Sequence, residues 1–309
     1  MITRVFHRLR PALVLLSRIV GSLLVLQSVG SSADTTYRST VSEVRLAFFA
    51  SDELNRGIET LQHDDFAVVD NGLVIRQFRS FSHSDVTRLE IVLLVDGSES
   101  VVPRFRQEIA DVLRLISETQ SISDDHISVI SFGGMRETVV CSGNCRDSPV
   151  VDRLLGARAE GATPLFDAVQ LAGNFLAERH VPDTRPVLIL FSDGEDTISR
   201  VSSNDALQAV LASEALVYAV DLNKPGSSTR GAWVLQTMAD ATGGSHLSIH
   251  QGAAQILQTV LQDLHAGYLV TYKLPNGAAG FHSVRILPTR NPNLKFRCRG
   301  GYVYQSANR

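Results

Sequence analysis

The sequence lacks the excess of one charge sign that would indicate nucleic acid or another polyelectrolyte as a partner. Its 309 residues include 29 Lys and Arg and 32 Asp and Glu, so the formal net charge is -3. Proteins that bind nucleic acid through phosphate contacts usually carry a clear basic excess. No block of like charges is present either. With 44% hydrophobic residues, the composition predicts a globular protein with one substantial core, a smaller accessory domain and no nucleic acid partner.

No uninterrupted apolar run reaches the roughly 20 residues that a membrane span requires. The apolar stretch at residues 11–29 is interrupted by Arg18, follows an arginine-rich start and ends in small residues at 31–33. This order of basic, apolar and small-residue regions is typical of a secretory signal. We expect residues 1–33 to direct export to the periplasm or the extracellular space. An uncleaved membrane anchor is the alternative, and only in that case would the protein contact a membrane.

The chain contains only three cysteines, and no histidine lies at ligand spacing from them, so a zinc site is not indicated. Cys141 and Cys145 flank Ser142-Gly143-Asn144, a turn-forming triplet that would let the two sulfurs meet. An exported protein is able to oxidise such a pair. Cys298 is then left over. Other pairings, or three free thiols, remain alternatives because geometry and not spacing decides a disulfide.

Catalytic motifs are also missing. Ser98 lacks the second glycine of a Gly-x-Ser-x-Gly elbow, and no histidine follows in a recognisable triad. No glycine-rich phosphate loop with Lys-Ser or Lys-Thr is present. Asp96-Gly97-Ser98 resembles an aspartyl phosphotransferase loop only in part, because Ser98 stands where such a loop has its second aspartate. We therefore expect no enzyme, with a metal-dependent hydrolase as the weakest alternative.

What the sequence does contain, between residues 88 and 267, is a regular alternation of apolar runs and amphipathic stretches. Continuous apolar runs are typical of strands buried on both faces of a parallel sheet. Apolar residues at helical spacing predict the helices between them, and Trp233 is interpreted as core packing of one such helix. The runs predicted as strands are 89–95, 127–132, 138–141, 186–191, 215–220 and 245–249, and the predicted helices are 103–119, 164–176, 206–212, 233–241 and 253–264. This alternation predicts an α/β domain with a doubly wound, mostly parallel open sheet of the Rossmann-like type.

The flanks at 34–87 and 268–309 have a different character, with short β-prone runs and turns. Asn71-Gly72 between two such runs is a strong hairpin signal. Neither flank has enough strands for an independently stable sheet. We expect the two flanks to pair into one small β accessory domain.

Polar residues follow the ends of the buried runs and indicate a metal site. Asp96, Ser98 and Ser100 follow one predicted strand, Asp193 follows another, and Thr163 precedes a predicted helix. In an open α/β sheet these positions meet at the carboxyl edge, where ligands bind. Mg2+ prefers oxygen ligands and usually keeps several waters, so hydroxyls with carboxylates suit it.

Each piece also has an ordinary structural explanation. Asp-Gly after a strand is a common turn. Thr163 before Pro164 is a good helix N-cap, and Ser98 and Ser100 could cap the helix beginning near residue 103. The nearby acidic residues Glu99, Glu195 and Asp196 are interpreted as solvated turn charges. The joint occurrence of these pieces, in order and at one sheet edge, favours the metal site.

The same residues resemble the metal-ion-dependent adhesion site (MIDAS) of von Willebrand factor type A domains. Asp96-x-Ser98-x-Ser100, Thr163 and Asp193 match its five positions, and the likeness covers about residues 88–265. The flanking stretches 64–72 and 300–304 are similar to those of secreted bacterial proteins of this kind. The resemblance implies direct coordination by Ser98, Ser100 and Thr163, with Asp96 and Asp193 acting through water.

The hydroxyl-rich site predicts a function in binding. A cation held mainly by neutral hydroxyls remains under-neutralised and attracts one more anionic oxygen. We expect Mg2+, with Mn2+ or Ca2+ as alternatives, and a partner protein whose Asp or Glu carboxylate completes the coordination, which describes an exported adhesion or interaction module. The alternative is an envelope scaffold or assembly protein with a structural metal.

Overall fold

The computed structural model describes residues 43–83, 88–122, 126–134, 136–143, 145, 148–179, 184–274 and 279–304. Residues 41–309 form one compact unit. The segment expected to be a signal, residues 1–33, lies outside the described residues. In the described part of the chain, no helix combines the length and apolar character needed to cross a membrane.

A six-stranded sheet forms the centre of this unit. Its strands lie in the order β10 (Ser245–Ser248), β9 (Leu216–Asp221), β8 (Thr184–Ser192), β5 (Arg88–Asp96), β6 (His126–Gly133) and β7 (Arg136–Cys141). All neighbours are parallel except β7, which runs antiparallel to β6 at the edge. From β5 the chain first builds toward β6 and β7, then returns to add β8, β9 and β10 on the other side. The predicted doubly wound sheet is confirmed, and its order reverses between β5 and β8, where such sheets bind ligands.

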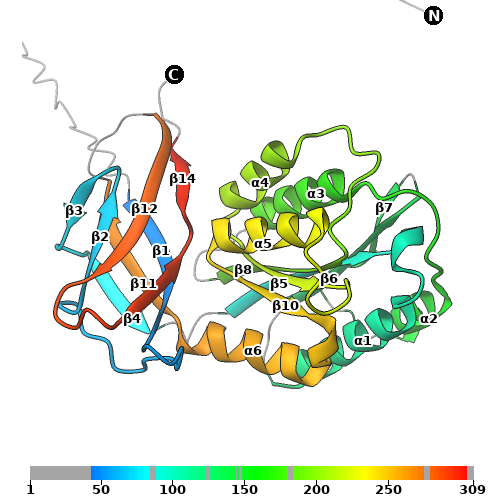
Figure 1. The fold of residues 1–309 in the computed structure, drawn as a ribbon, viewed down its shortest axis with the longest axis horizontal. Coiled ribbons are helices and arrows are strands. Elements are labelled where there is room, and N and C mark those ends of the chain that lie inside the picture. Colours follow the sequence, from blue (N-terminus) through cyan, green and yellow to red (C-terminus); the bar gives the residue numbers. More distant parts are fainter. Residues whose placement is uncertain are drawn as a thin grey trace, which may run out of the picture. The chain divides into compact units, whose positions relative to one another are not determined.

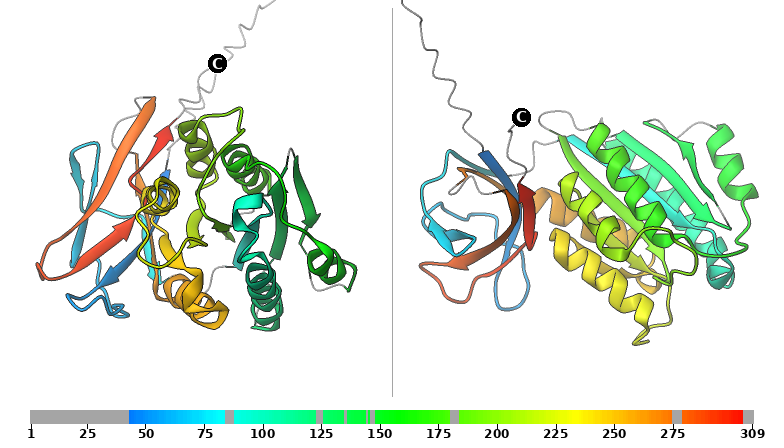
Figure 2. Two further views of the ribbon diagram at one scale, coloured as in Figure 1. Left: turned by 45° about the vertical axis from the view of Figure 1, so that its right-hand side comes forward. Right: turned by 90° about the horizontal axis from the view of Figure 1, so that it is seen from above.

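Helices cover both faces of this sheet (Figures 1 and 2). One face packs against α1, α2 and α6, and the other against α3, α4 and α5. Their bounds are α1 (Phe105–Ile122), α2 (Ser148–Gly156), α3 (Leu165–Glu178), α4 (Ser203–Ala212), α5 (Arg230–Thr242) and α6 (Ala253–Ala266), with short 3-10 turns η1 (Glu99–Val101) and η2 (Ile249–Gln251). The apolar periodicity predicted all of these helices except α2.

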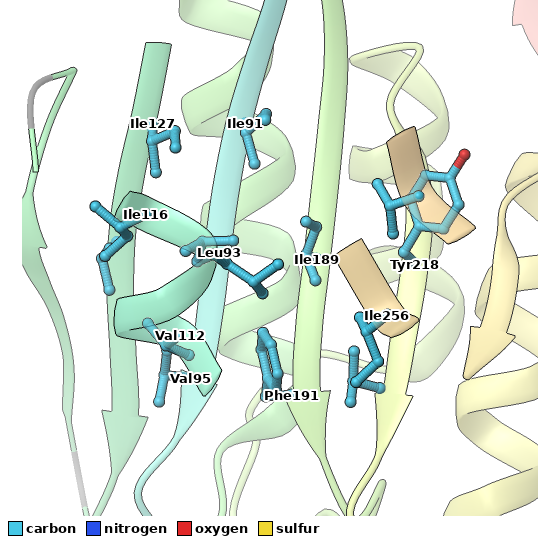
Figure 3. Packing of buried hydrophobic residues seen from close by; sticks show 14 of the residues in the cluster. Ile91, Leu93, Val95, Val112, Ile116, Ile127, Ile189, Phe191, Tyr218 and Ile256 are labelled. Carbon is cyan, nitrogen blue, oxygen red and sulfur yellow. The ribbon is translucent and has the colours of Figure 1, made fainter. Parts of the chain in front are cut away.

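The strand side chains alternate between two cores. Leu93 and Val95 lie on the α1 side with Val112 (Figure 3), whereas Val92 and Leu94 belong to the cluster on the opposite face. Both sets are almost completely buried. This double burial explains why the strand reads as a continuous apolar run instead of an alternating one.

The interpretation of Trp233 as a core residue is wrong, because its side chain is 67% exposed. The buried residues of α5 include Leu235, Met238 and Ala239. At about 100° per residue, Trp233 points well away from the face that these residues share. Helical spacing alone did not distinguish the two faces.

The two flanks pair with each other in two further sheets, which together we call the accessory β-domain. One sheet has the order β13 (Lys295–Cys298), β1 (Glu43–Ser51), β11 (Tyr268–Lys273) and β4 (Ser80–His83), and the other β14 (Gly301–Tyr304), β12 (Gly280–Pro288), β2 (Phe66–Asp70) and β3 (Leu73–Ile75). Asn71 and Gly72 both have positive φ and close the predicted hairpin between β2 and β3. A core that includes Phe48, Phe66 and Tyr272 lies between the sheets. The expected pairing of the flanks is therefore present.

Cys141 and Cys145 form a disulfide, with Cα atoms 5.7 Å apart, so the pairing suggested by their spacing is present. Cys298 is a free thiol. Burial raises the pKa of the Cys298 thiol to about 11. The thiol therefore remains protonated, and unreactive as a nucleophile, at neutral pH.

Candidate metal centre

The reversal point between β5 and β8 places Asp96 and Asp193 at one edge of the sheet. Asp96 is the last residue of β5, and Asp193 directly follows β8. The two strands are hydrogen-bonded neighbours, with Val95 opposite Phe191. Both carboxylates therefore lie at the carboxyl edge, as the sequence predicted.

The loop after β5 orders Asp96, Ser98 and Ser100 together. Asp96 and Ser98 are fully buried, and Asp96 Oδ1 accepts a hydrogen bond of 2.9 Å from the Ser98 backbone N–H. The hydroxyl of Ser192, at the end of β8, donates to Asp96 Oδ2 at 2.6 Å. The Ser98 and Ser100 hydroxyl oxygens lie 3.0 Å apart. Asp96 is thus fixed by hydrogen bonds while the two serine hydroxyls sit side by side.

Thr163 does not cap the helix that follows it, contrary to the ordinary explanation for that residue. The N-cap position of α3 belongs to Pro164, which makes no side-chain capping bond. The first free amides of α3, those of Phe166 and Asp167, donate to the Ser199 hydroxyl at 2.9 and 3.1 Å. Thr163 is 2% exposed, so its hydroxyl is a buried group that helix capping does not use.

The capping explanation for the two serines fails as well. Ser98 precedes η1 but makes no side-chain capping hydrogen bond there. The helix α1 begins only at Phe105, beyond the reach of a cap at Ser100. None of the three candidate hydroxyls is therefore used as a helix cap, and those of Ser98 and Ser100 are hydrogen-bonded to each other.

The loop after β8 is held in place by close packing. Gly194 has φ +78°, and a Cβ built there would lie 2.2 Å from the carbonyl oxygen of Gly231. The side-chain amide of Asn223 donates to the Asp193 carbonyl at 2.7 Å, and Asp193 Oδ1 accepts from the Glu195 N–H at 3.1 Å. Asp193 is 9% exposed and Asp96 is 0% exposed, so Asp193 is the less buried of the two carboxylates.

Backbone hydrogen bonds tie the three loops to each other. The N–H of Glu99 donates to the Gly161 carbonyl at 2.9 Å, and the N–H of Glu160 donates to Gly97 O at 2.8 Å. Thr163 N–H donates to the Thr197 hydroxyl at 2.7 Å, which joins the second loop to the third. The five predicted residues thus belong to one connected set of loops.

The neighbouring acidic residues divide into two kinds. Glu99 and Glu195 are exposed, as predicted for solvated turn charges. Asp196 is not, because its Oδ1 accepts hydrogen bonds from the Phe166 N–H at 3.3 Å and from the Ser199 hydroxyl. Asp196 therefore supports the start of α3, where negative charge is favoured by the helix dipole.

The electrostatics of the site favour a cation. Burial raises the pKa of Asp96 to about 6; hydrogen bonds from Ser192 and Ser98 oppose this shift, and the negative charge of Asp193 adds to it. Two carboxylates that repel each other in a buried place are stabilised by an added positive charge.

Glu108 is a buried acidic residue that the sequence analysis missed. It lies on α1, is completely buried, and neither carboxyl oxygen has a hydrogen-bond partner among the described residues. Burial raises its pKa well above the usual range, and the negative charge of Asp96 raises it further. It lies three residues after Phe105 and four before Val112, both buried, and this spacing places it on the apolar face of the helix. An acidic residue on the apolar face of a helix was the sequence signal that could have identified Glu108 as a buried charge.

The donor set fits a small divalent cation. In octahedral Mg2+ coordination, with bonds of about 2.1 Å, neighbouring ligand oxygens lie about 3.0 Å apart. The Ser98 and Ser100 hydroxyl oxygens have this separation in the structure. Within the described ranges, no group of three or more His, Cys, Asp and Glu side chains is arranged to hold a metal, so a soft-metal or all-carboxylate site is not formed there.

Comparison with known proteins gives the family of this region. A family model described as von Willebrand factor type A domain matches residues 91–195. No curated protein matches the chain.

Similar solved structures include three bacterial proteins. An aerotolerance-related membrane protein from Bacteroides fragilis NCTC 9343 has 16% sequence identity and a TM-score of 0.42, covering 57% of this chain and 98% of that one. BatB from Bacteroides thetaiotaomicron has 16% identity and a TM-score of 0.45, with the same coverage of 57% and 98%. A von Willebrand factor type A protein from Catenulispora acidiphila has 13% identity and a TM-score of 0.47, covering 88% of this chain and 76% of that one.

The family assignment depends on the matched segment, because identities this low show at most a shared fold. That segment contains all five candidate residues, Asp96, Ser98, Ser100, Thr163 and Asp193. Residues 91–195 belong to a von Willebrand factor type A domain.

Proposed function

We propose that the chain is an exported protein-binding module whose type A domain docks a partner through a divalent cation. In this proposal Ser98, Ser100 and Thr163 hold Mg2+ directly, and Asp96 and Asp193 act through water. The bound cation supplies a positive charge that accepts an Asp or Glu carboxylate of the partner. The observation that carries the proposal is the set of three hydroxyls at one sheet edge that are free of helix-capping duties.

The surroundings of the site support a protein partner. Exposed apolar side chains lie close in sequence to two of the site loops: Val102, which is 51% exposed, follows Ser100, and Ile198, which is 41% exposed, follows Asp193 by five residues. Trp233 is 67% exposed. Trp233 lies near the start of α5, whose Gly231 packs on the Asp193 loop. Exposed apolar and aromatic side chains around a polar centre are typical of protein interfaces.

The two carboxylates of the site have separate tasks in this proposal. Asp96 is oriented by Ser98 N–H and Ser192 Oγ, so its carboxylate cannot swing away when a partner approaches. Asp193 is the less buried of the two carboxylates, and in this proposal the partner's carboxylate enters on its side. The arrangement offers an electrophilic binding position without a nucleophile and base pair, and we propose binding without catalysis.

The metal itself is the first test. Isothermal titration of the full chain with Mg2+, Mn2+ and Ca2+ is expected to show one site that Asp96→Ala and Thr163→Ala weaken by at least about tenfold, or about 1.4 kcal/mol. Asp152→Ala, at an exposed position on α2, is the matched control and is expected to bind as the wild type does. Equal affinity in all four proteins would contradict the site.

Partner binding is the second test. Proteins captured from native membranes and medium in the presence of Mg2+ should be released by EDTA and should not bind Asp96→Ala. If a partner protein is still captured in EDTA, and also by both Asp96→Ala and Thr163→Ala, carboxylate docking is overturned. Such a result would favour a structural metal in an envelope scaffold. Turnover in hydrolase or phosphatase screens that is lost in Ser98→Ala would overturn the proposal that the site only binds.

A further inference from the structure

A cavity with an unusual share of arginine lies at the opposite edge of the central sheet. Its volume is about 40 Å³, and its lining includes Arg45 of β1, Arg185 of β8, Arg299 between β13 and β14, and Glu214. Arg185 is near the amino end of β8 and Asp193 directly follows its carboxyl end. At about 3.3 Å per residue, this separates the cavity from the metal centre by about 26 Å.

Two of these arginines are buried with unused hydrogen-bond donors. Arg185 is 6% exposed and Arg299 is 8% exposed. Arg185 Nη1 donates to the Leu264 carbonyl at 3.1 Å, but its Nη2 has no partner among the described residues. Arg299 Nη2 donates to the Arg45 carbonyl at 2.7 Å, while its Nε has no partner there. A buried guanidinium donor without an acceptor is costly, so it indicates an acceptor that the protein does not supply.

The charge of the lining is not balanced either. The only carboxylate in the lining is Glu214, which lies 3.3 Å from Arg299 Nη1 and keeps 40% of its side chain exposed. In the described part of the chain, neither Arg45 nor Arg185 forms an ion pair with a carboxylate. Burial lowers the pKa of Arg185 to about 10, although the nearby Tyr218 opposes this, and the positive charge of Arg45 lowers it further. Three guanidinium groups thus face one carboxylate.

We propose that this cavity, lined by Arg45, Arg185 and Arg299, binds a small inorganic oxyanion of the phosphate or sulfate class. Guanidinium groups recognise such anions by charge-assisted hydrogen bonds from their planar N–H donors. A water molecule needs about 10–15 Å³ of such space, so this cavity exceeds one water yet is too small for a nucleotide. The three arginines come from both flanks and from the type A domain, and the anion therefore links the accessory β-domain to the central sheet.

The test is the response of stability and heat of binding to anions, using the full chain in EDTA so that the metal centre does not contribute. Sodium phosphate and sodium sulfate, in separate titrations, are expected to raise the midpoint of thermal unfolding, because a ligand that binds only the native state stabilises it. Sodium chloride at matched ionic strength is expected to have no comparable effect. The two oxyanion arms distinguish phosphate from sulfate as the preferred ligand.

Variants decide whether the cavity is the site. Arg45→Gln, which leaves both buried guanidinium groups in place, is expected to weaken oxyanion affinity about tenfold by calorimetry. Arg185→Gln is expected to abolish the response. Arg285→Gln, at an exposed position on β12, is the matched control and should respond as the wild type does.

Two results would overturn the proposal. The first is a wild-type midpoint that phosphate and sulfate raise no more than chloride does. The second is an oxyanion response that persists unchanged in Arg45→Gln, which stays informative if Arg185→Gln fails to fold. Because EDTA is present throughout, neither result bears on the proposed metal docking.

Discussion

At the scale of single residues, the position of the Asp193 carboxylate depends on Gly194. A Cβ at Gly194 would lie 2.2 Å from Gly231 O, and its φ of +78° is one that other residues avoid. We expect Gly194→Ala to lower the free energy of unfolding by about 2–4 kcal/mol, since left-handed strain of about 1–2 kcal/mol is joined by a backbone clash. Mg2+ affinity should fall with it.

Gly226→Ala is the matched control for this prediction. Gly226 also has positive φ, +71°, but a Cβ there would meet nothing within 4 Å. Gly226→Ala should lower the free energy of unfolding by only about 1–2 kcal/mol, through left-handed strain, and should leave Mg2+ affinity unchanged. Urea denaturation and metal titration of both variants measure the difference. If Gly194→Ala and Gly226→Ala lose the same free energy of unfolding and the same Mg2+ affinity, the contact with Gly231 does not position the loop.

The sequence predicted the ends of strands better than the roles of side chains. Asp96 and Asp193 were placed correctly because a buried strand must end where its apolar run ends. The ordinary capping explanation for Thr163 does not hold, because Ser199 and Asp196, more than thirty residues later, reach the amides of α3. Long-range hydrogen bonds of this kind leave no trace in local spacing. Glu108, by contrast, was visible as a charge on an apolar helix face.

At the scale of elements, the helix and the strand that the sequence did not predict are both short. The strand β4 (Ser80–His83) has only four residues, and its pairing with β11 is a contact between segments far apart in the sequence. The helix α2 (Ser148–Gly156) has nine residues and follows the disulfide turn closely. Helices this short are marginal by themselves and depend on tertiary packing, here through the buried Val150 and Leu154.

The disulfide that precedes α2 gives an element-scale prediction. Cys141 ends β7, and Cys145 lies four residues on, fully buried, so the closed loop is very short. The loop-entropy estimate for such a loop is about 2 kcal/mol. The double variant Cys141→Ser with Cys145→Ala should therefore unfold about 4–8 °C below the wild type.

Mg2+ binding should be unchanged in this double variant, because the disulfide contacts none of the five site residues. Reduction of the wild-type protein is the matched comparison and should shift the midpoint equally. Three reactive thiols in the denatured, unreduced protein would show that the bond is absent. A collapse of Mg2+ affinity would show that the β7 turn supports the metal loops after all.

At the scale of the whole molecule, Arg297 of β13 joins the accessory β-domain to the six-stranded sheet and its helices. Its Nη1 donates to the Gly243 carbonyl at 3.0 Å and to the Ser245 hydroxyl at 2.7 Å. Its Nη2 pairs with Asp263 of α6 at 2.7 Å, and its guanidinium lies 4.2 Å from the centre of the Phe49 ring. One side chain of the C-terminal flank thus binds the end of α5, the start of β10, α6 and β1.

This arrangement predicts that the accessory β-domain and the central sheet unfold together through Arg297. Arg297→Ala should lower the free energy of unfolding by about 1–3 kcal/mol, a range that allows for solvent screening of the partly exposed Asp263 pair. Calorimetry should then show a calorimetric enthalpy larger than the van't Hoff enthalpy, as two weakly coupled parts unfold separately. Arg297→Lys keeps the charge but not the planar guanidinium, so its free energy of unfolding should lie between those of the wild type and Arg297→Ala. A single transition with an unchanged midpoint in Arg297→Ala would mean that the strand connections alone couple the domains, and that the Arg297 contacts add nothing to that coupling.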